Sequence, residues 1–261
     1  MMNEHFVEEP GVTLAWGRAL ETVARPGRKE IAPLTVSITG DDSKQILSED
    51  ARVRKELDRL LKANGKPSVD TVANTIFPDS LWNPSKPRQA LFDRYQRIAP
   101  RIRQAARQNK HGIYFERIIA NGPGDNENQL DFGLRTYSGR KGVRRSVLQV
   151  GVFDPGQDHS AAAMRGFPCL QHLSFVPDSQ NCLSVNAFYA IQYMFSKAYG
   201  NYLGLCHLGR FVAHELGLNL TRVTCHVGLA ELDAKKSDLR DILALIDATF
   251  EEHRRLNNNG L

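Results

Sequence analysis

The chain of 261 residues lacks the segments that mark secreted and membrane proteins. No apolar run reaches the roughly 18 residues that a membrane-spanning helix needs. The first residues, MMNEHFVEEPGV, carry acidic side chains where a secretory signal would be basic, so we expect a cytoplasmic protein and no membrane partner. The four cysteines form no Cys-x-x-Cys pair, so we expect neither a disulfide framework nor a metal site.

The composition is that of a globular protein with one core. Hydrophobic residues make up 41% of the chain and charged residues 24%, which predicts a single domain over residues 1–261. The net charge of +5 includes basic clusters at 94–107 and 135–145. Because no aromatic residues alternate with these clusters and no nucleic-acid motif is present, a small phosphorylated ligand is favoured over a nucleic-acid polymer.

Hydrophobic periodicity predicts helices and strands of ordinary length. Helices are expected at 12–25, 51–63, 68–76, 88–108, 130–137, 197–216 and 239–256. Strands are expected at 34–39, 147–153, 170–176, 182–189 and 221–227. Residues 147–153 are apolar at nearly every position, as in a strand covered on both faces. The predicted strands cluster in the middle and the helices at the ends, which favours an α+β fold with a mixed sheet covered by helices.

One cysteine has neighbours that suit nucleophilic chemistry. Cys169 follows Phe167-Pro168, which restricts the backbone, and lies downstream of the arginine pair Arg144-Arg145. A thiolate attacks electron-poor carbon when nearby cations or dipoles lower its pKa. Paired arginines suit bidentate phosphate binding. From these residues alone, a buried core cysteine beside a surface arginine pair is favoured over a catalytic cysteine.

The segment around this cysteine resembles the active-site half of the thymidylate synthases. Pro168-Cys169 matches the stretch that carries the family's nucleophile, and Asn201 follows a glycine at the head of a predicted helix, where the family has an asparagine. The resemblance covers roughly residues 110–230 and is clearest from 144 to 226. Further matches keep the family's order and distance: Arg144-Arg145, Phe175, Leu183-Ser184 and His226.

The resemblance implies a fold, a reaction and a set of site residues. Cys169 would attack C6 of a pyrimidine nucleotide, and Asn201 would hold the edge of the base. Arg144 and Arg145 would bind the phosphate of a ligand in the neighbouring subunit, and His226 would contact the sugar. The family further implies a thymidylate synthase-like fold, a homodimer, and 5,10-methylenetetrahydrofolate as the donor of a one-carbon unit to C5.

Several family residues are replaced in this chain. Ala190, Ile191 and Tyr193 stand where the family has a phosphate-binding arginine and serine and an aspartate of the nucleotide and folate sites. Asn74 aligns with the family's glutamate, and it cannot act as a general acid or base. Methyl and hydroxymethyl transfer both stay open. So do two other classes: a non-catalytic nucleotide-binding or regulatory protein, and a dimeric scaffold in which Cys169 only packs.

Overall fold

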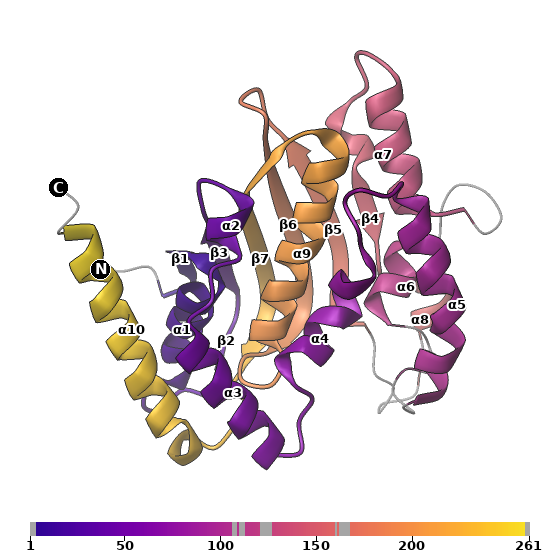
Figure 1. Cartoon of the computed structure of the whole chain (residues 1–261). Coiled ribbons are helices and arrows are strands. Elements are labelled where there is room, and N and C mark those ends of the chain that lie inside the picture. Colours follow the sequence, from indigo (N-terminus) through magenta and orange to yellow (C-terminus); the bar gives the residue numbers. More distant parts are fainter. Residues whose placement is uncertain are drawn as a thin grey trace.

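A computed structural model describes residues 4–105, 109, 113–120, 127–159, 161 and 168–258. Seven strands form one mixed sheet in the order β1-β3-β7-β6-β5-β4, with β2 beside β7 (Figure 1). The strands are β1 (Phe6–Pro10), β2 (Glu30–Ile31), β3 (Leu34–Thr39), β4 (Gln149–Gly151), β5 (Leu170–Pro177), β6 (Cys182–Tyr193) and β7 (Asn219–Glu231). The α-helices are α1 (Gly11–Ala24), α2 (Ser43–Ile46), α3 (Ala51–Ala63), α4 (Val69–Ile76), α5 (Gln89–Ala105), α6 (Tyr114–Ile118), α7 (Gln129–Gly139), α8 (Pro155–Asp158), α9 (Ala198–Leu216) and α10 (Arg240–Asn258). Short 3-10 helices include η1 (Asp79–Leu81) and η3 (Arg145–Val147).

The centre of the sheet is the parallel pair β6 and β7, which α9 connects. β5 runs antiparallel to β6 through a tight turn. In that turn the Asp178 carboxylate accepts the N–H groups of Gln180 (2.8 Å) and Cys182 (2.9 Å). Helix α9, which follows β6, ends at Gly217. The φ of Gly217 is 66°, the left-handed conformation that glycine adopts readily. The start of α9 therefore lies at the carboxyl ends of β6 and β7.

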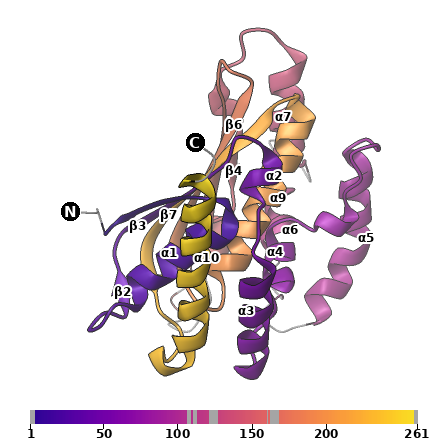
Figure 2. The ribbon, with the colours of Figure 1, turned by 60° about the vertical axis from the view of Figure 1, so that its left-hand side comes forward.

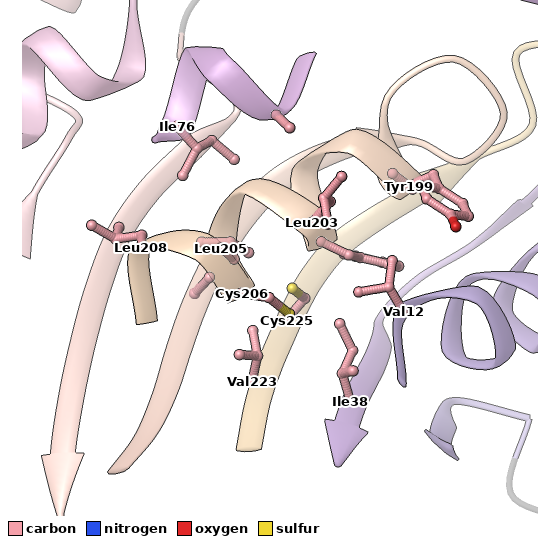
Figure 3. Close-up of a cluster of buried hydrophobic side chains, with 14 of the residues drawn as sticks. Val12, Ile38, Ile76, Tyr199, Leu203, Leu205, Cys206, Leu208, Val223 and Cys225 are labelled. Atoms are coloured by element: carbon pink, nitrogen blue, oxygen red, sulfur yellow. The ribbon is translucent and has the colours of Figure 1, made fainter. Parts of the chain in front are cut away.

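The helices cover one face of the sheet, and the main core lies between this face and the helices. Figures 1 and 2 show α1, α4, α9 and α10 on the same side of the strands. In the middle of this layer, side chains of α9 meet side chains of β7, β3 and α1 (Figure 3). They are fully buried, and burial of an aliphatic side chain contributes about 1.5–3 kcal/mol; they include Val12, Ile38, Leu205, Cys206, Val223 and Cys225.

The other face of the sheet is not covered by helices in the described part of the chain (Figure 2). Along β6 the side chains alternate between buried ones under α9 and partly or fully exposed ones on this uncovered face. Cross-strand partners form a row over it, made of Phe6, Thr35, His226, Phe188 and His172. Large hydrophobic side chains left exposed on β1 and β6 are Phe6, Phe188, Ile191 and Tyr193.

Most of the predicted elements are present. The helix predicted at 51–63 is α3, and it begins after Asp50, whose carboxylate accepts the N–H groups of Arg52 and Val53. The mixed sheet flanked by helices confirms the predicted α+β class. No helix among the described residues is long and apolar enough to span a membrane.

Two sequence predictions about the strands are wrong. The strand expected at 147–153 is only Gln149–Gly151, at the edge of the sheet, because Arg145–Val147 forms a 3-10 turn and β5 is its single neighbour. The strand is also not covered on both faces, because in Gln149–Gly151 only Val150 is fully buried. The expected separation of strands from helices also fails, because β1 and β3 near the N-terminus belong to the sheet.

Candidate functional site

Cys169 lies at the end of the sheet where α9 begins. It directly precedes β5, and its carbonyl oxygen accepts the N–H of Ala190 on β6 at 2.9 Å. This pairing places Cys169 beside the last residues of β6 and the connection into α9. In sheets with parallel strands, ligands bind at the carboxyl ends of the strands, where helix N-termini present free N–H groups.

Two tyrosines surround the thiol of Cys169. The hydroxyl of Tyr114, on α6, hydrogen-bonds the thiol and accepts the N–H of Leu170 at 3.5 Å. Tyr189, on β6, is fully buried beside Cys169 and Tyr114, and its hydroxyl has no hydrogen-bond partner. Burial raises the pKa of the Cys169 thiol, whereas Tyr114 and the charge of Lys197 act to lower it. The resting thiol is therefore protonated, and both groups favour its ionised form.

Lys197 is the residue before α9, and it is half-buried between Cys169 and Asp233. Asp233 follows β7, and one carboxylate oxygen accepts the N–H groups of Phe195 (3.0 Å) and Ser196 (3.1 Å). Its second oxygen is buried without a hydrogen-bond partner. Burial lowers the pKa of Lys197, and the negative charge of Asp233 opposes that effect. The connection between β6 and α9 is thus held by the carboxylate of Asp233, and it carries an ammonium group whose charge favours the ionised form of the Cys169 thiol.

Asn201 is in the first turn of α9 and only 5% exposed. Its backbone N–H donates to the carbonyl of Lys197 at 2.9 Å. Asn201 therefore lies about one helical turn after Lys197, in the first turn of α9. Its side-chain amide forms no hydrogen bond with the described residues. A buried amide of this kind is suited to reading a polar ligand edge.

A further buried amide lies at the same end of the sheet. Gln192 of β6 accepts a hydrogen bond from the hydroxyl of Tyr202 at 3.0 Å, and its Nε2 has no partner. Three side chains near the start of α9 thus have a buried polar atom without a hydrogen-bond partner: Tyr189, Gln192 and Asp233. Each such atom costs about 1–3 kcal/mol when it stays unpaired.

The structure does not bring His226 to this site. His226 is exposed on the uncovered face of the sheet, where Nδ1 lies 3.4 Å from the hydroxyl of Thr35. Its neighbour Cys225 points the other way, toward Cys206 in the core (Figure 3). The sheet therefore lies between His226 and the helix-covered face that carries Asn201. The assignment of His226 to a sugar stays a prediction.

Arg144 and Arg145 lie at the opposite end of the sheet from Cys169. They enter η3, which leads to β4, and β4 pairs antiparallel with His172–Ser174 of β5, so that the chain before β4 runs toward the end of β5. Arg144 and Arg145 are level with the end of β5. About seven residues of extended strand separate this end from Cys169, which corresponds to about 23 Å at about 3.3 Å per residue. Figure 1 shows the loop after α7 and the start of α9 at opposite ends of the sheet. Both arginines are exposed, and within the described residues neither has an ion pair.

Sequence reasoning missed Tyr114, Tyr189, Lys197 and Asp233. A positional signal for two of them is present in the sequence, because Lys197 and Asp233 come just after the two parallel strands. The tyrosines carry no such signal. In the Cys206-His207 and Cys225-His226 pairs both cysteines are buried in the core. His207 lies at the surface of α9, and His226 lies on the uncovered face of the sheet. Among the described residues no group of three or more His, Cys, Asp or Glu side chains could hold a metal ion.

No family model matches the chain, and no curated protein matches it.

Proposed function

We propose that the chain is a thymidylate synthase-like enzyme in which Cys169 attacks C6 of a pyrimidine nucleotide and a one-carbon unit is transferred to C5. The observation that carries this proposal is that Cys169, Lys197 and the buried Asn201 all lie at the end of the sheet where α9 begins. The order of β5, β6, α9 and β7 and the mixed sheet support the thymidylate synthase fold as part of the same proposal.

The first step is addition of the thiol across the C5–C6 double bond. The thiol loses its proton, a bond forms between Sγ and C6, and the electron pair of the double bond moves toward C5 and the C4 carbonyl. Asn201 holds the polar edge of the base while this charge develops. If C5 then takes a proton from solvent, loss of its original proton and of the thiolate restores the base. This exchange needs no further reactant.

Transfer of a carbon unit requires a donor, and 5,10-methylenetetrahydrofolate would supply it as an electrophile for C5. At the position where the family has an aspartate of the folate site, this chain has Tyr193, whose side chain is 43% exposed. The buried carboxylate at this end of the sheet is Asp233, which follows β7 and keeps one oxygen unpaired. A cyclic amide N–H, as in the folate ring system, fits that acceptor. Asp233 and Gln192 are therefore the residues that would hold the donor.

The proposal includes a homodimer that shares its sites. Arg144 and Arg145 are too far from Cys169 in one chain to bind a nucleotide held there. A second copy packed on the uncovered face, related by a two-fold axis across the strands, brings the arginine end of one sheet to the cysteine end of the other. The exposed Phe188, Ile191 and Tyr193 would be buried in that contact.

The proposed reaction is tested by release of tritium from C5 of labelled dUMP, dCMP, UMP and CMP. We expect the protein to release tritium from one of them, with or without methylenetetrahydrofolate, and Cys169→Ala to abolish release. Cys182→Ala is the matched control, because Cys182 is also half-buried but lies at the other end of β6. Absence of release from all four, in the presence of the folate, would contradict the enzyme.

A nucleotide-binding protein without catalysis is the second candidate. It is favoured by the raised pKa of Cys169 and by Ala190 and Ile191 in place of phosphate ligands. Such a protein would show protection of Cys169 from alkylation by one of the four nucleotides but no release of tritium. A scaffold would show neither effect.

A further inference from the structure

Helix α5 carries three exposed arginines on one of its sides. Arg94, Arg97 and Arg101 follow one another at intervals of three and four residues, so they lie on successive turns of the helix. At about 1.5 Å per residue they form a stripe about 10 Å long, which we call the arginine stripe. Another side of α5 packs into the protein through its buried residues, which are Leu91, Phe92, Tyr95 and Ala99.

No carboxylate among the described residues forms an ion pair with the arginine stripe, whereas most other described arginines are ion-paired. Arg94 donates to the carbonyl oxygen of Leu81 at 3.2 Å, and Arg97 donates to the backbone carbonyl oxygen of Asp93 at 3.2 Å. The Asp93 carboxylate accepts a hydrogen bond from the side chain of Gln89 at 2.8 Å. The stripe therefore presents three positive charges that the described part of the protein does not neutralise.

The arginine stripe lies at the edge of the molecule. Figure 2 shows α5 on the outer side of the helical layer, away from the uncovered face of the sheet. The dimer proposed above uses that uncovered face, so it would leave α5 accessible. Figure 1 shows α5 and α10 at opposite ends of the molecule. The stripe is therefore a surface that a large ligand can reach.

Three positive charges at this spacing fit the phosphates of duplex DNA. Each strand of the duplex carries one phosphate about every 3.4 Å along the axis, so a stripe of about 10 Å spans about three of them. An α-helix is about 10–12 Å wide and fits the major groove of B-form DNA, which is about 12 Å wide. The deep, narrow major groove of A-form RNA does not admit side chains in this way.

Two other polyanions fit the arginine stripe less well. Single strands are held largely by bases that stack on aromatic side chains, and the exposed positions of α5 include no aromatic residue. A helix that inserts into an anionic membrane needs large apolar residues on its exposed side, whereas those of α5 are buried in the protein. The lack of interleaved aromatic residues in the sequence thus argues against a single strand, and it does not bear on duplex phosphates.

We propose that the arginine stripe of α5 binds the phosphate backbone of duplex DNA. The contacts are made to phosphate oxygens, so binding does not depend on the base sequence. Each contact releases condensed counterions, and the logarithm of the affinity falls with the logarithm of the salt concentration by about 0.9 per phosphate. Three contacts give a slope of about −2.7, which corresponds to about a 40-fold loss of affinity between 50 and 200 mM NaCl. The binding is independent of the proposed reaction at Cys169.

The test is the fluorescence anisotropy of a labelled DNA duplex of about 20 base pairs, titrated with the full chain at 25 to 200 mM NaCl. The double variant Arg97→Gln, Arg101→Gln removes two contacts and keeps the hydrogen bond between Arg94 and Leu81. We expect its slope to fall to about −0.9, so that the affinity changes only about fourfold between 50 and 200 mM NaCl. The double variant Arg97→Lys, Arg101→Lys keeps both charges and should keep the slope of the parent.

The matched control is the double variant Arg254→Gln, Arg255→Gln, which removes the same charge from the exposed side of α10, at the other end of the molecule. Its slope should equal that of the parent. The proposal would be overturned if the parent did not bind the duplex at 25 mM NaCl, or if Arg97→Gln, Arg101→Gln kept the parent slope. Tighter binding to a single strand of equal length, to duplex RNA or to vesicles of phosphatidylserine would overturn it as well. Because no substrate nucleotide is present, none of these results depends on the tritium experiment.

Discussion

At the scale of single residues, the environment of each cysteine decides what its thiol can do. Cys206 and Cys225 meet in the core between α9 and β7, where burial raises the pKa of both (Figure 3). Cys169 is also desolvated, but Tyr114 and Lys197 partly offset that effect. Of the four cysteines, Cys206 and Cys225 are buried core residues, whereas Cys169 and Cys182 are partly exposed. The groups that act on Cys169 come from three separate segments, α6, β6 and the residue before α9, so their proximity could not be predicted from local sequence.

Glu21 supplies a residue-scale prediction about pH and stability. It lies on α1 against α10, and burial, together with a hydrogen bond that the protonated Glu21 donates to Asp247, raises the pKa of Glu21 to about 7, although Arg18 at 2.8 Å opposes the shift. The folded state therefore binds this proton more tightly than the unfolded state, whose glutamate has a pKa of about 4.3. Stability from this group is complete below the unfolded pKa and is lost as the pH rises through 7.

The substitution Glu21→Gln keeps the shape and removes the ionisation. We expect it to raise the free energy of unfolding by about 1–2 kcal/mol at pH 8 relative to the parent, and to bring no such gain at pH 4.5. Urea unfolding at the two pH values measures the difference. Glu251→Gln, on the exposed side of α10, serves as the control and should be neutral at both. A gain that is the same at pH 4.5 and pH 8 would show that ionisation of Glu21 is not its cause.

At the scale of elements, the contact between α4 and α9 determines where the start of α9 lies. Two glycines of α9 face α4 directly. A Cβ atom on Gly200 would lie 2.6 Å from Cβ of Val72, and one on Gly204 would lie 2.6 Å from the carbonyl oxygen of Ala73. These approaches are shorter than van der Waals contact, so the helices can pack this closely only because both side chains are absent.

Gly204→Ala should therefore destabilise the protein despite the better helix propensity of alanine. Propensity alone favours alanine by about 1 kcal/mol, whereas overpacking against a backbone carbonyl costs about 1–3 kcal/mol. We expect a net loss of unfolding free energy, measured by denaturant titration. Gly139→Ala is the matched control, since a Cβ there meets no atom within 4 Å at the end of α7. It should be neutral or stabilising, and a loss of equal size in both variants would rule out the packing argument.

The sequence predicts long, strongly patterned elements better than short or edge ones. α3, α9 and β3 follow from caps and periodicity, and their predicted bounds differ from the observed ones by one residue at most. β1 was missed because five residues with two glutamates and a proline have no strand pattern, and it is stabilised by pairing with β3. The strand at 147–153 was overestimated because burial of its side chains comes from helix packing, which apolar content cannot distinguish from strand neighbours.

At the scale of the whole molecule, the two ends of the sheet carry different parts of the proposed site. Cys169, Lys197 and Asn201 gather where α9 begins, and Arg144-Arg145 are exposed near the other end of β5. One chain cannot join them, since about seven residues of extended strand lie between them. In the proposed two-fold dimer through the uncovered face, the cysteine end of each sheet would meet the arginine end of the other, which would form two sites. Each site then needs one cysteine and the other subunit's arginines.

The most direct test of such a shared nucleophilic site mixes two inactive variants and measures release of tritium from the C5-labelled nucleotide that the parent prefers. Cys169→Ala and the double variant Arg144→Ala, Arg145→Ala should each be inactive alone. After subunit exchange, half of the dimers are mixed and one of their two sites is intact, so about a quarter of the parent activity should return. If the mixture stays inactive while native mass analysis shows mixed dimers, or if Cys169→Ala alone releases tritium, the proposed site is wrong.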